Sequence, residues 1–224
     1  MSTNKFINSA KKTIEIQANS ISSLTNQIDK SFAEICKRIS LLKGKLIVMG
    51  VGKSGHVGQK VSATLASTGT PSFFIHPTEA AHGDLGMIAK DDAVLIFSNS
   101  GETNEVAAIL PALKRMTSDI FSITGNANSS IAKASSVHLK VQVEKEACPH
   151  DLAPTSSTTA SMVIGDALAI SLIEEKKFSS EDFAKSHPAG ELGKKLTTYV
   201  GDLSINGNEV PCVEIDSSIK DTIL

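Results

Sequence analysis

A glycine-rich loop near the start of the chain has the composition of an anion site. It reads Gly50-Val-Gly-Lys-Ser-Gly-His56, so its backbone can approach a ligand closely, and the amides of the helix expected to follow attract negative charge. Lys53 and Ser54 add an ammonium and a hydroxyl. The glycine spacing also matches the fingerprint of dinucleotide-binding proteins, but His76 stands where that fingerprint has an acidic residue that binds the ribose. A Walker A loop does not fit either, because Ile47 stands in place of its first glycine. With both nucleotide motifs incomplete, the loop predicts a site for an anion the size of a phosphate beside a lysine.

A second loop, Ser98-Asn-Ser-Gly-Glu-Thr-Asn-Glu105, also suits a phosphate monoester, because hydroxyls can donate to it while backbone amides converge at a helix start. The hydroxyls come from Ser98, Ser100 and Thr103. The alternative is ordinary helix capping, with Asn99 as the cap and Glu102 three residues on. Glu105 lies a turn farther, so a ligand-facing role is open to it.

A third hydroxyl cluster precedes the longest apolar helix that the pattern predicts. Its first members are Thr155, Ser156 and Ser157. By itself this cluster is explained equally well as a helix cap with solvated neighbours. Three such clusters that follow successive elements of one sheet together predict a phosphorylated small molecule as the ligand.

Three histidines stand in predicted loops, two of them directly before proline. Proline favours an extended predecessor, which takes His76 and His187 out of any helix, and His82 precedes a glycine. We expect His56 and His138 to be structural. No ligand spacing of the H-E-x-x-H kind supports a catalytic metal, and we expect none, although His76 and His82 could bind an inhibitory zinc ion.

Composition narrows the class of protein. The chain has 224 residues, 41% of them hydrophobic, and a net charge of −2, which argues against a basic nucleic-acid binder and against general disorder. No apolar run approaches the roughly 20 residues that span a bilayer, and no signal-peptide core is present. The three cysteines lack disulfide or zinc spacing. We expect a globular cytoplasmic protein without cofactor, nucleic-acid or membrane partners.

The periodicity of apolar residues changes along the chain from helical to alternating strands and helices. Residues 5–42 predict one or two helices, with a break near Asn19-Ser20. Continuous apolar strands separated by helices then predict a parallel sheet covered on both faces, an α/β class three-layer α/β/α sandwich. The strands are expected at Leu46–Met49, Ser72–Ile75, Ala93–Phe97, Ile120–Ile123 and His138–Val143. The helices are expected at Gly55–Ser67, Glu102–Met116, Ser129–Ala134 and Thr158–Lys176, with a short one capped near Ser179.

These motifs in this order closely resemble the sugar-isomerase (SIS) domain of the bacterial D-arabinose 5-phosphate isomerases. The resemblance covers roughly residues 45–196. Beyond the three hydroxyl loops, it rests on Ala66-Ser-Thr-Gly-Thr-Pro71, His76-Pro, Ala81-His-Gly-Asp-Leu-Gly86, Glu146-Ala-Cys-Pro149 and Ser186-His-Pro188.

The resemblance implies a flavodoxin-like five-stranded parallel sheet, a homotetramer, and an enzyme that interconverts D-ribulose 5-phosphate and D-arabinose 5-phosphate through a cis-enediol(ate). That reaction is the entry to Kdo, a sugar of lipopolysaccharide. The implied organisation is a helical arm over residues 1–43, a SIS domain over 44–199, and the truncated start of a CBS domain over 200–224.

The resemblance also implies the site. The catalytic residues of the family fall on Lys53, Glu105, Glu146 and His187, and substrate contacts fall on Gly69, Thr70, His76 and His82. A carboxylate or imidazole, Glu146 or His187, would move the proton between C1 and C2, while Lys53 would stabilise the enediolate. Glu105 would assist ring opening or orient the others. The hydroxyl loops would hold the 5-phosphate, and the His187 loop could reach a neighbouring subunit.

Two departures from the family pattern lie near these residues. His150-Asp151 replaces the expected Leu-Gly after Pro149, and we expect Asp151 to tolerate a left-handed backbone. Ala189 replaces a glycine, which would stiffen the His187 loop.

Two other functions stay open on the same scaffold. One is an isomerase of another phosphosugar, and the other is a non-catalytic sugar-phosphate sensor. A nicotinamide-dependent enzyme is a third, weaker interpretation of the Gly50 loop.

Overall fold

The computed structural model describes residues 3–188, 190–205, 210 and 212–220. Its centre is one parallel sheet in the order β2-β1-β3-β4-β5. The strands are β1 (Leu46–Gly50), β2 (Ser72–Phe74), β3 (Ala93–Phe97), β4 (Ile120–Thr124) and β5 (Val137–Lys140). Every residue of β1, β3 and β4 is buried, as expected for strands covered on both faces. The predicted five-stranded parallel sheet is confirmed.

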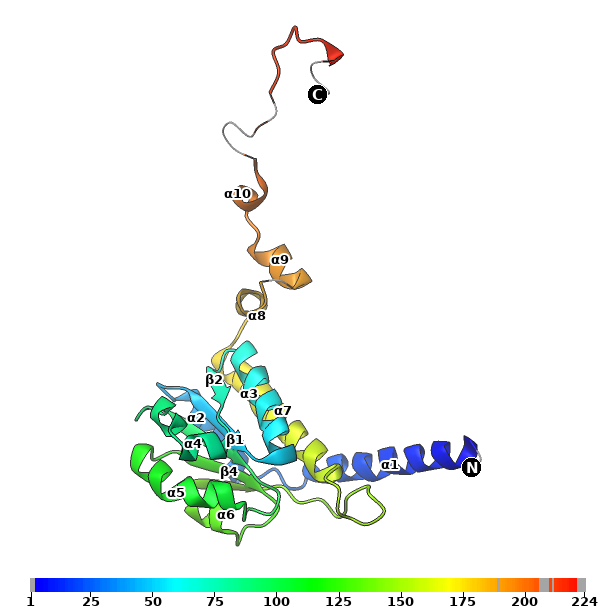
Figure 1. The fold of residues 1–224 in the computed structure, drawn as a ribbon, viewed down its shortest axis with the longest axis vertical. Coiled ribbons are helices and arrows are strands. Elements are labelled where there is room, and N and C mark those ends of the chain that lie inside the picture. Colours follow the sequence, from blue (N-terminus) through cyan, green and yellow to red (C-terminus); the bar gives the residue numbers. More distant parts are fainter. Residues whose placement is uncertain (1–2, 189, 206–209, 211, 221–224) are drawn as a thin grey trace. The chain divides into compact units, whose positions relative to one another are not determined.

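Helices cover both faces of this sheet, so the predicted three layers are confirmed (Figure 1). Alternate residues along β1 show the division, because Val48 belongs to one buried cluster and Ile47 to the other. The cluster of Val48 includes residues of α2 (Lys30–Ser40), α3 (Gly52–Ser67) and α7 (Ser156–Lys176). The cluster of Ile47 includes residues of α4 (Pro77–Ala81), α5 (Asn104–Met116) and α6 (Ser130–Ala134).

The chain begins with a long helix that continues past its predicted break. α1 spans Thr3–Leu24, and Ser20 lies buried inside it, donating from Oγ to the Ile16 carbonyl at 3.0 Å. This local bond satisfies the hydroxyl within the helix, so the prediction of a break near Asn19-Ser20 is wrong. The chain instead turns after Leu24, and Asp29 caps α2 by accepting from the Ser31 amide at 2.8 Å.

α7 lies against α1, α2 and α3, which accounts for its apolar composition. Gly165 allows the close approach to α3, since a Cβ at that position would collide with the Val61 side chain. Among the described residues, α7 alone is long and apolar enough to match a membrane span, with a mean hydropathy of 1.3. The sequence pattern predicts no such segment. Eight of its residues are buried, as in the core helix of a globular unit.

Contacts divide the chain into two compact units, residues 1–179 and 180–224. The first contains the sheet, the layers on it and a short 3-10 helix, η1 (Asp84–Met87). The second contains α8 (Ser180–Ser186), α9 (Glu191–Thr197) and α10 (Val200–Leu203). α8 begins directly after Ser179, where a helix start was expected. The expected opening of a CBS domain falls partly on residues 206–209, 211 and 221–224, which lie outside the described chain.

Candidate active site

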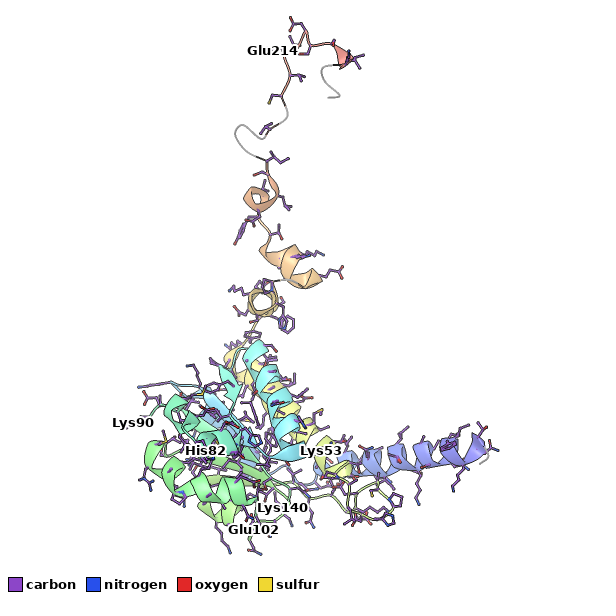
Figure 2. All side chains as sticks on the ribbon, in the orientation of Figure 1. Lys53, His82, Lys90, Glu102, Lys140 and Glu214 are labelled. Carbon is purple, nitrogen blue, oxygen red and sulfur yellow. The ribbon has the colours of Figure 1, made fainter. Side chains whose placement is uncertain are left out.

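The carboxyl ends of β1 and β3 and the start of α7 meet around one small cavity of about 150 Å³. Its lining consists of Val51, Lys53, Ser54, Val57, Asn99, Pro154, Ser157, Thr158 and Ser161. One residue or more of each predicted hydroxyl loop therefore lies here, because parallel strands bring their carboxyl ends to one edge of the sheet. Lys53 is exposed in the first turn of α3, as Figure 2 shows.

The hydroxyls that open α7 are buried to an unusual degree. Ser156 is fully buried, and its Oγ has no hydrogen-bond partner among the described residues. Ser157 Oγ lies close enough to the Glu146 carboxylate to help lower its pKa, but in a geometry that forms no hydrogen bond. Buried hydroxyls without partners are costly, so Ser157, which lines the cavity, is suited to a ligand oxygen. Ser156 does not line the cavity.

The loop after β3 uses part of its predicted phosphate-binding hydroxyls to hold itself together. Ser98 is only 3% exposed, and its Oγ accepts from the Gly101 amide at 3.0 Å and lies 2.8 Å from Thr103 Oγ1. Ser100 Oγ accepts from the Glu102 amide at 3.2 Å and is exposed. These bonds let Gly101 adopt a φ of 70°, which a residue with a side chain rarely adopts.

The capping alternative for this loop is wrong. α5 begins at Asn104, with Thr103 at the N-cap position, so Asn99 is no cap and lines the cavity instead. Glu102 accepts from the Ser130 amide at 2.9 Å, a bond that lowers its pKa and ties the loop to α6, beside which Figure 2 shows it. Glu105 stands exposed in the first turn of α5.

Glu146 caps the long helix α7 with its carboxylate. Its Oε2 accepts from the Thr155 amide at 2.7 Å, from Thr155 Oγ1 at 3.0 Å and from the Ser157 amide at 3.3 Å. Partial burial acts to raise the pKa of Glu146, but these donors outweigh it and the pKa lies below its ordinary value. The group is therefore ionised at neutral pH. It lines a separate cavity of about 610 Å³ between α1 and its own loop, not the Lys53 cavity.

Two predicted substrate contacts lie at the opposite end of the sheet, where the strands begin. Gly69 and Thr70 precede β2, whereas the residues of the cavity follow their strands, so the structure does not bring them together. Lys176 Nζ donates to the Gly69 carbonyl at 3.3 Å and to Thr70 Oγ1 at 2.9 Å, and burial lowers the pKa of this lysine. Phe178 packs so closely on Gly69 that no Cβ would fit there.

The histidines after β2 have different surroundings. His76 caps α4, accepting from the Thr78 amide through Nδ1 at 3.2 Å, and His82 is exposed where that helix ends. Neither lines the Lys53 cavity. His138 Nε2 lies 3.0 Å from Thr124 Oγ1, so its predicted structural role is confirmed, whereas His56 is exposed. No group of three metal-ligating side chains occurs within the residues described.

His187 belongs to the second unit. Its Nδ1 lies 2.9 Å from the Phe183 carbonyl, and its ring stacks on the Phe183 ring at 4.0 Å. Gly193 packs against the His187 carbonyl without room for a side chain. Ala189, whose effect on this loop was predicted, lies outside the described residues.

Asn99, Thr158 and Ser161 also line the cavity. The sequence offers Asn99 only as the cap of the alternative interpretation and Thr158 only as a further member of the third hydroxyl cluster, and no motif includes Ser161. The signal for Ser161 was available, because it lies one helical turn after Ser157 and so on the same face of α7.

Comparisons with known proteins identify the family of this chain. The SIS domain family matches residues 42–171. The arabinose 5-phosphate isomerases KdsD of Escherichia coli K12 and Pseudomonas aeruginosa are each 50% identical over 219 residues, which is 98% of this chain and 67% of the relative. A structure from Escherichia coli CFT073 in complex with arabinose 5-phosphate superposes with a TM-score of 0.82 at 43% identity, covering 84% of this chain and 100% of that one. The chain therefore belongs to the SIS-domain family and, within it, to the arabinose 5-phosphate isomerases.

Proposed function

We propose that this protein interconverts D-ribulose 5-phosphate and D-arabinose 5-phosphate. The observation that carries the proposal is the shared cavity of Lys53, Ser54, Asn99 and Ser157, on a chain half identical to arabinose 5-phosphate isomerases. A lysine, an amide and two hydroxyls at helix starts form a receptor for an oxygen-rich anion. A pentose 5-phosphate anchored there would keep its first two carbons at a constant position relative to a base.

The chemistry moves a carbon-bound proton between C1 and C2, and a hydroxyl proton between O2 and O1. A base removes the proton from C2 of the aldose or C1 of the ketose, and the electrons form the enediolate. A proton then passes between O1 and O2, and an acid returns a proton to the other carbon. Glu146 is ionised at neutral pH and so suits the base better than the acid. His187 is the second candidate for proton transfer, Lys53 stabilises the oxyanion, and Glu105 assists ring opening or orientation.

The complete site requires more than one copy of the chain in this proposal. The family resemblance implies that the His187 loop of one chain reaches the Lys53 site of a neighbour. Gly69 and the buried Thr70 lie at the end of the sheet away from that cavity and do not complete it. α1 exposes Phe6 at 65% and Ile14 at 67%, apolar surface of the kind that subunits cover. We infer a homotetramer.

A mixing experiment tests this arrangement. Lys53→Ala and His187→Ala chains, each inactive alone, should regain part of the activity when refolded together, because a mixed oligomer contains some intact sites. No recovery in a mixed oligomer verified by mass spectrometry would mean that each site is built within one subunit.

The reaction itself is tested by NMR with ribulose 5-phosphate in deuterated buffer. We expect arabinose 5-phosphate to appear with deuterium at C2, because the transferred proton exchanges with solvent. Binding without turnover or exchange would instead identify a sugar-phosphate sensor, and turnover of hexose phosphates would identify another isomerase. We also propose that the product enters Kdo synthesis, that the protein is cytoplasmic, and that residues 200–224 are the start of a CBS domain.

A further inference from the structure

Asp151 occupies a backbone position that normally demands glycine. Its φ is 56°, in the left-handed region, and its amide donates to the Cys148 carbonyl at 3.0 Å to close a tight turn. The family resemblance implies a glycine here, and aspartate is one of the few other residues that tolerate this conformation. The departure therefore preserves the turn and adds a carboxylate to it.

That carboxylate is engaged with Glu146. Asp151 Oδ1 accepts from the Glu146 amide at 2.6 Å, the short length of a charge-assisted bond. The next amide, of Ala147, donates to Thr155 Oγ1 at 2.8 Å, and the same Thr155 hydroxyl donates to the Glu146 carboxylate. The backbone of Glu146 is thus held from one side by Asp151, and its side chain is held from the other by the start of α7.

We propose that Asp151 is a positioning residue for Glu146, acting through the Glu146 backbone. The inference rests on the proposed isomerase function, in which Glu146 transfers the proton. A glycine at position 151 would keep the turn but leave the Glu146 amide without an acceptor. The carboxylate of Glu146 would then leave the α7 amides for part of the time.

This loss would change how Glu146 titrates. The α7 donors lower the pKa of Glu146, so a carboxylate that spends less time on them has a higher pKa. The other charged or titratable groups around the same cavity are Lys12 from α1 and Lys145, Cys148 and Asp151 from the loop. Within the described chain, neither Lys12 nor Lys145 forms a hydrogen bond or ion pair with Glu146. The α7 amides are therefore the main stabilisation of the Glu146 carboxylate.

The test compares Asp151→Gly with Asp151→Asn in the full chain. For Asp151→Gly we expect kcat to fall on the order of ten-fold with KM changed less than two-fold, since one charge-assisted bond is lost at a positioning group. The acid limb of the kcat profile should move to higher pH. Asp151→Asn keeps an acceptor oxygen and should stay within about three-fold of the wild type.

Lys177→Gly is the matched control, because Lys177 is the other described non-glycine residue with a left-handed φ, 51°. Relief of backbone strain is common to both glycine variants, so only Asp151→Gly should shift the pH profile. Amide hydrogen exchange provides a readout independent of activity: the Glu146 amide should lose protection about five-fold in Asp151→Gly and keep it in Asp151→Asn.

Unchanged protection of the Glu146 amide in Asp151→Gly would overturn the inference, as would a kcat and pH profile equal to those of the wild type. Failure of the proposed function is a different result, because the wild-type chain would then be inactive with both pentose phosphates. The exchange measurement would still report the Asp151 contact in that case.

Discussion

Replacing Glu146 by glutamine tests the contact that links the proposed catalytic carboxylate to the fold. The substitution keeps the shape and one acceptor oxygen, and it removes the charge that three donors of Thr155 and Ser157 now face. Catalysis should fall in the same variant, but the stability measurement concerns the contact alone.

The magnitude follows from these bonds. Hydrogen bonds to an ionised acceptor contribute about 1.5–3 kcal/mol against about 0.5–1.5 for a neutral one, and a negative charge at a helix start adds about 0.3–1 kcal/mol. Solvent screens the partly exposed Glu146 carboxylate, so we take the low end, about 1–2 kcal/mol. For a unit of this size that loss lowers Tm by roughly 3–6 °C at pH 7.

The pH dependence has a definite sign. The folded-state pKa of Glu146 is lowered, so its contribution is complete above the ordinary value of about 4.3 and disappears as pH falls through the folded value. Thermal melting of both proteins at several pH values between about 7 and 3 measures this. The difference in Tm between the two proteins should disappear at the acid end. Glu146 is protonated and neutral there, like the glutamine, which does not titrate.

Equal Tm values at neutral pH would refute the reasoning, since they would mean that the carboxylate is not held by the α7 amides. A gap that persists unchanged at the acid end would do the same, since it would show that the charge is not what stabilises the cap.

Three further outcomes are expected. Lys53→Ala should lower kcat/KM by about 10²–10³ with an unchanged Tm, because Lys53 is exposed and lines the cavity; calorimetric or optical melting beside the rate assay decides this. Ser98→Ala should lower the stability by about 1–3 kcal/mol, since it leaves the buried Gly101 amide unpaired, and urea unfolding measures the loss. Cys148, whose pKa is lowered by surrounding backbone amides, should react with iodoacetamide at neutral pH before Cys36, whose pKa burial raises to about 11; mass spectrometry after brief labelling gives the order.

Local patterns were sufficient where a residue acts on its own chain neighbourhood. The buried strands and the helix after Gly50 were predictable, because the period of burial is a property of short segments. The left-handed backbone at Asp151 was expected only because the family resemblance implies a glycine there. The predicted helix break at Ser20 failed, since a hydroxyl that bonds its own preceding turn looks the same in sequence as one that ends a helix.

Hydroxyl residues show the limit most clearly. The sequence identified Ser98, Ser157 and Thr155 as one class of ligand for a phosphate. The structure divides them: Ser98 holds its loop together, Thr155 binds Glu146, and Ser157 lines the cavity with Lys53. A hydroxyl can serve a backbone amide, a carboxylate or a ligand equally well, so its partner depends on which groups lie within about 3 Å of it.

The sequence by itself determined the class of fold, the end of the sheet where the hydroxyl loops gather and the family to which the chain belongs. Only the tertiary structure decided that Glu146 caps α7 and lines a cavity separate from that of Lys53. The physical reason is that a carboxylate can accept from any amide within reach, and the path of the chain between residue 146 and α7 decides which amides those are. The sequence specifies which chemical groups the side chains carry, whereas the path of the chain determines which of them come into contact.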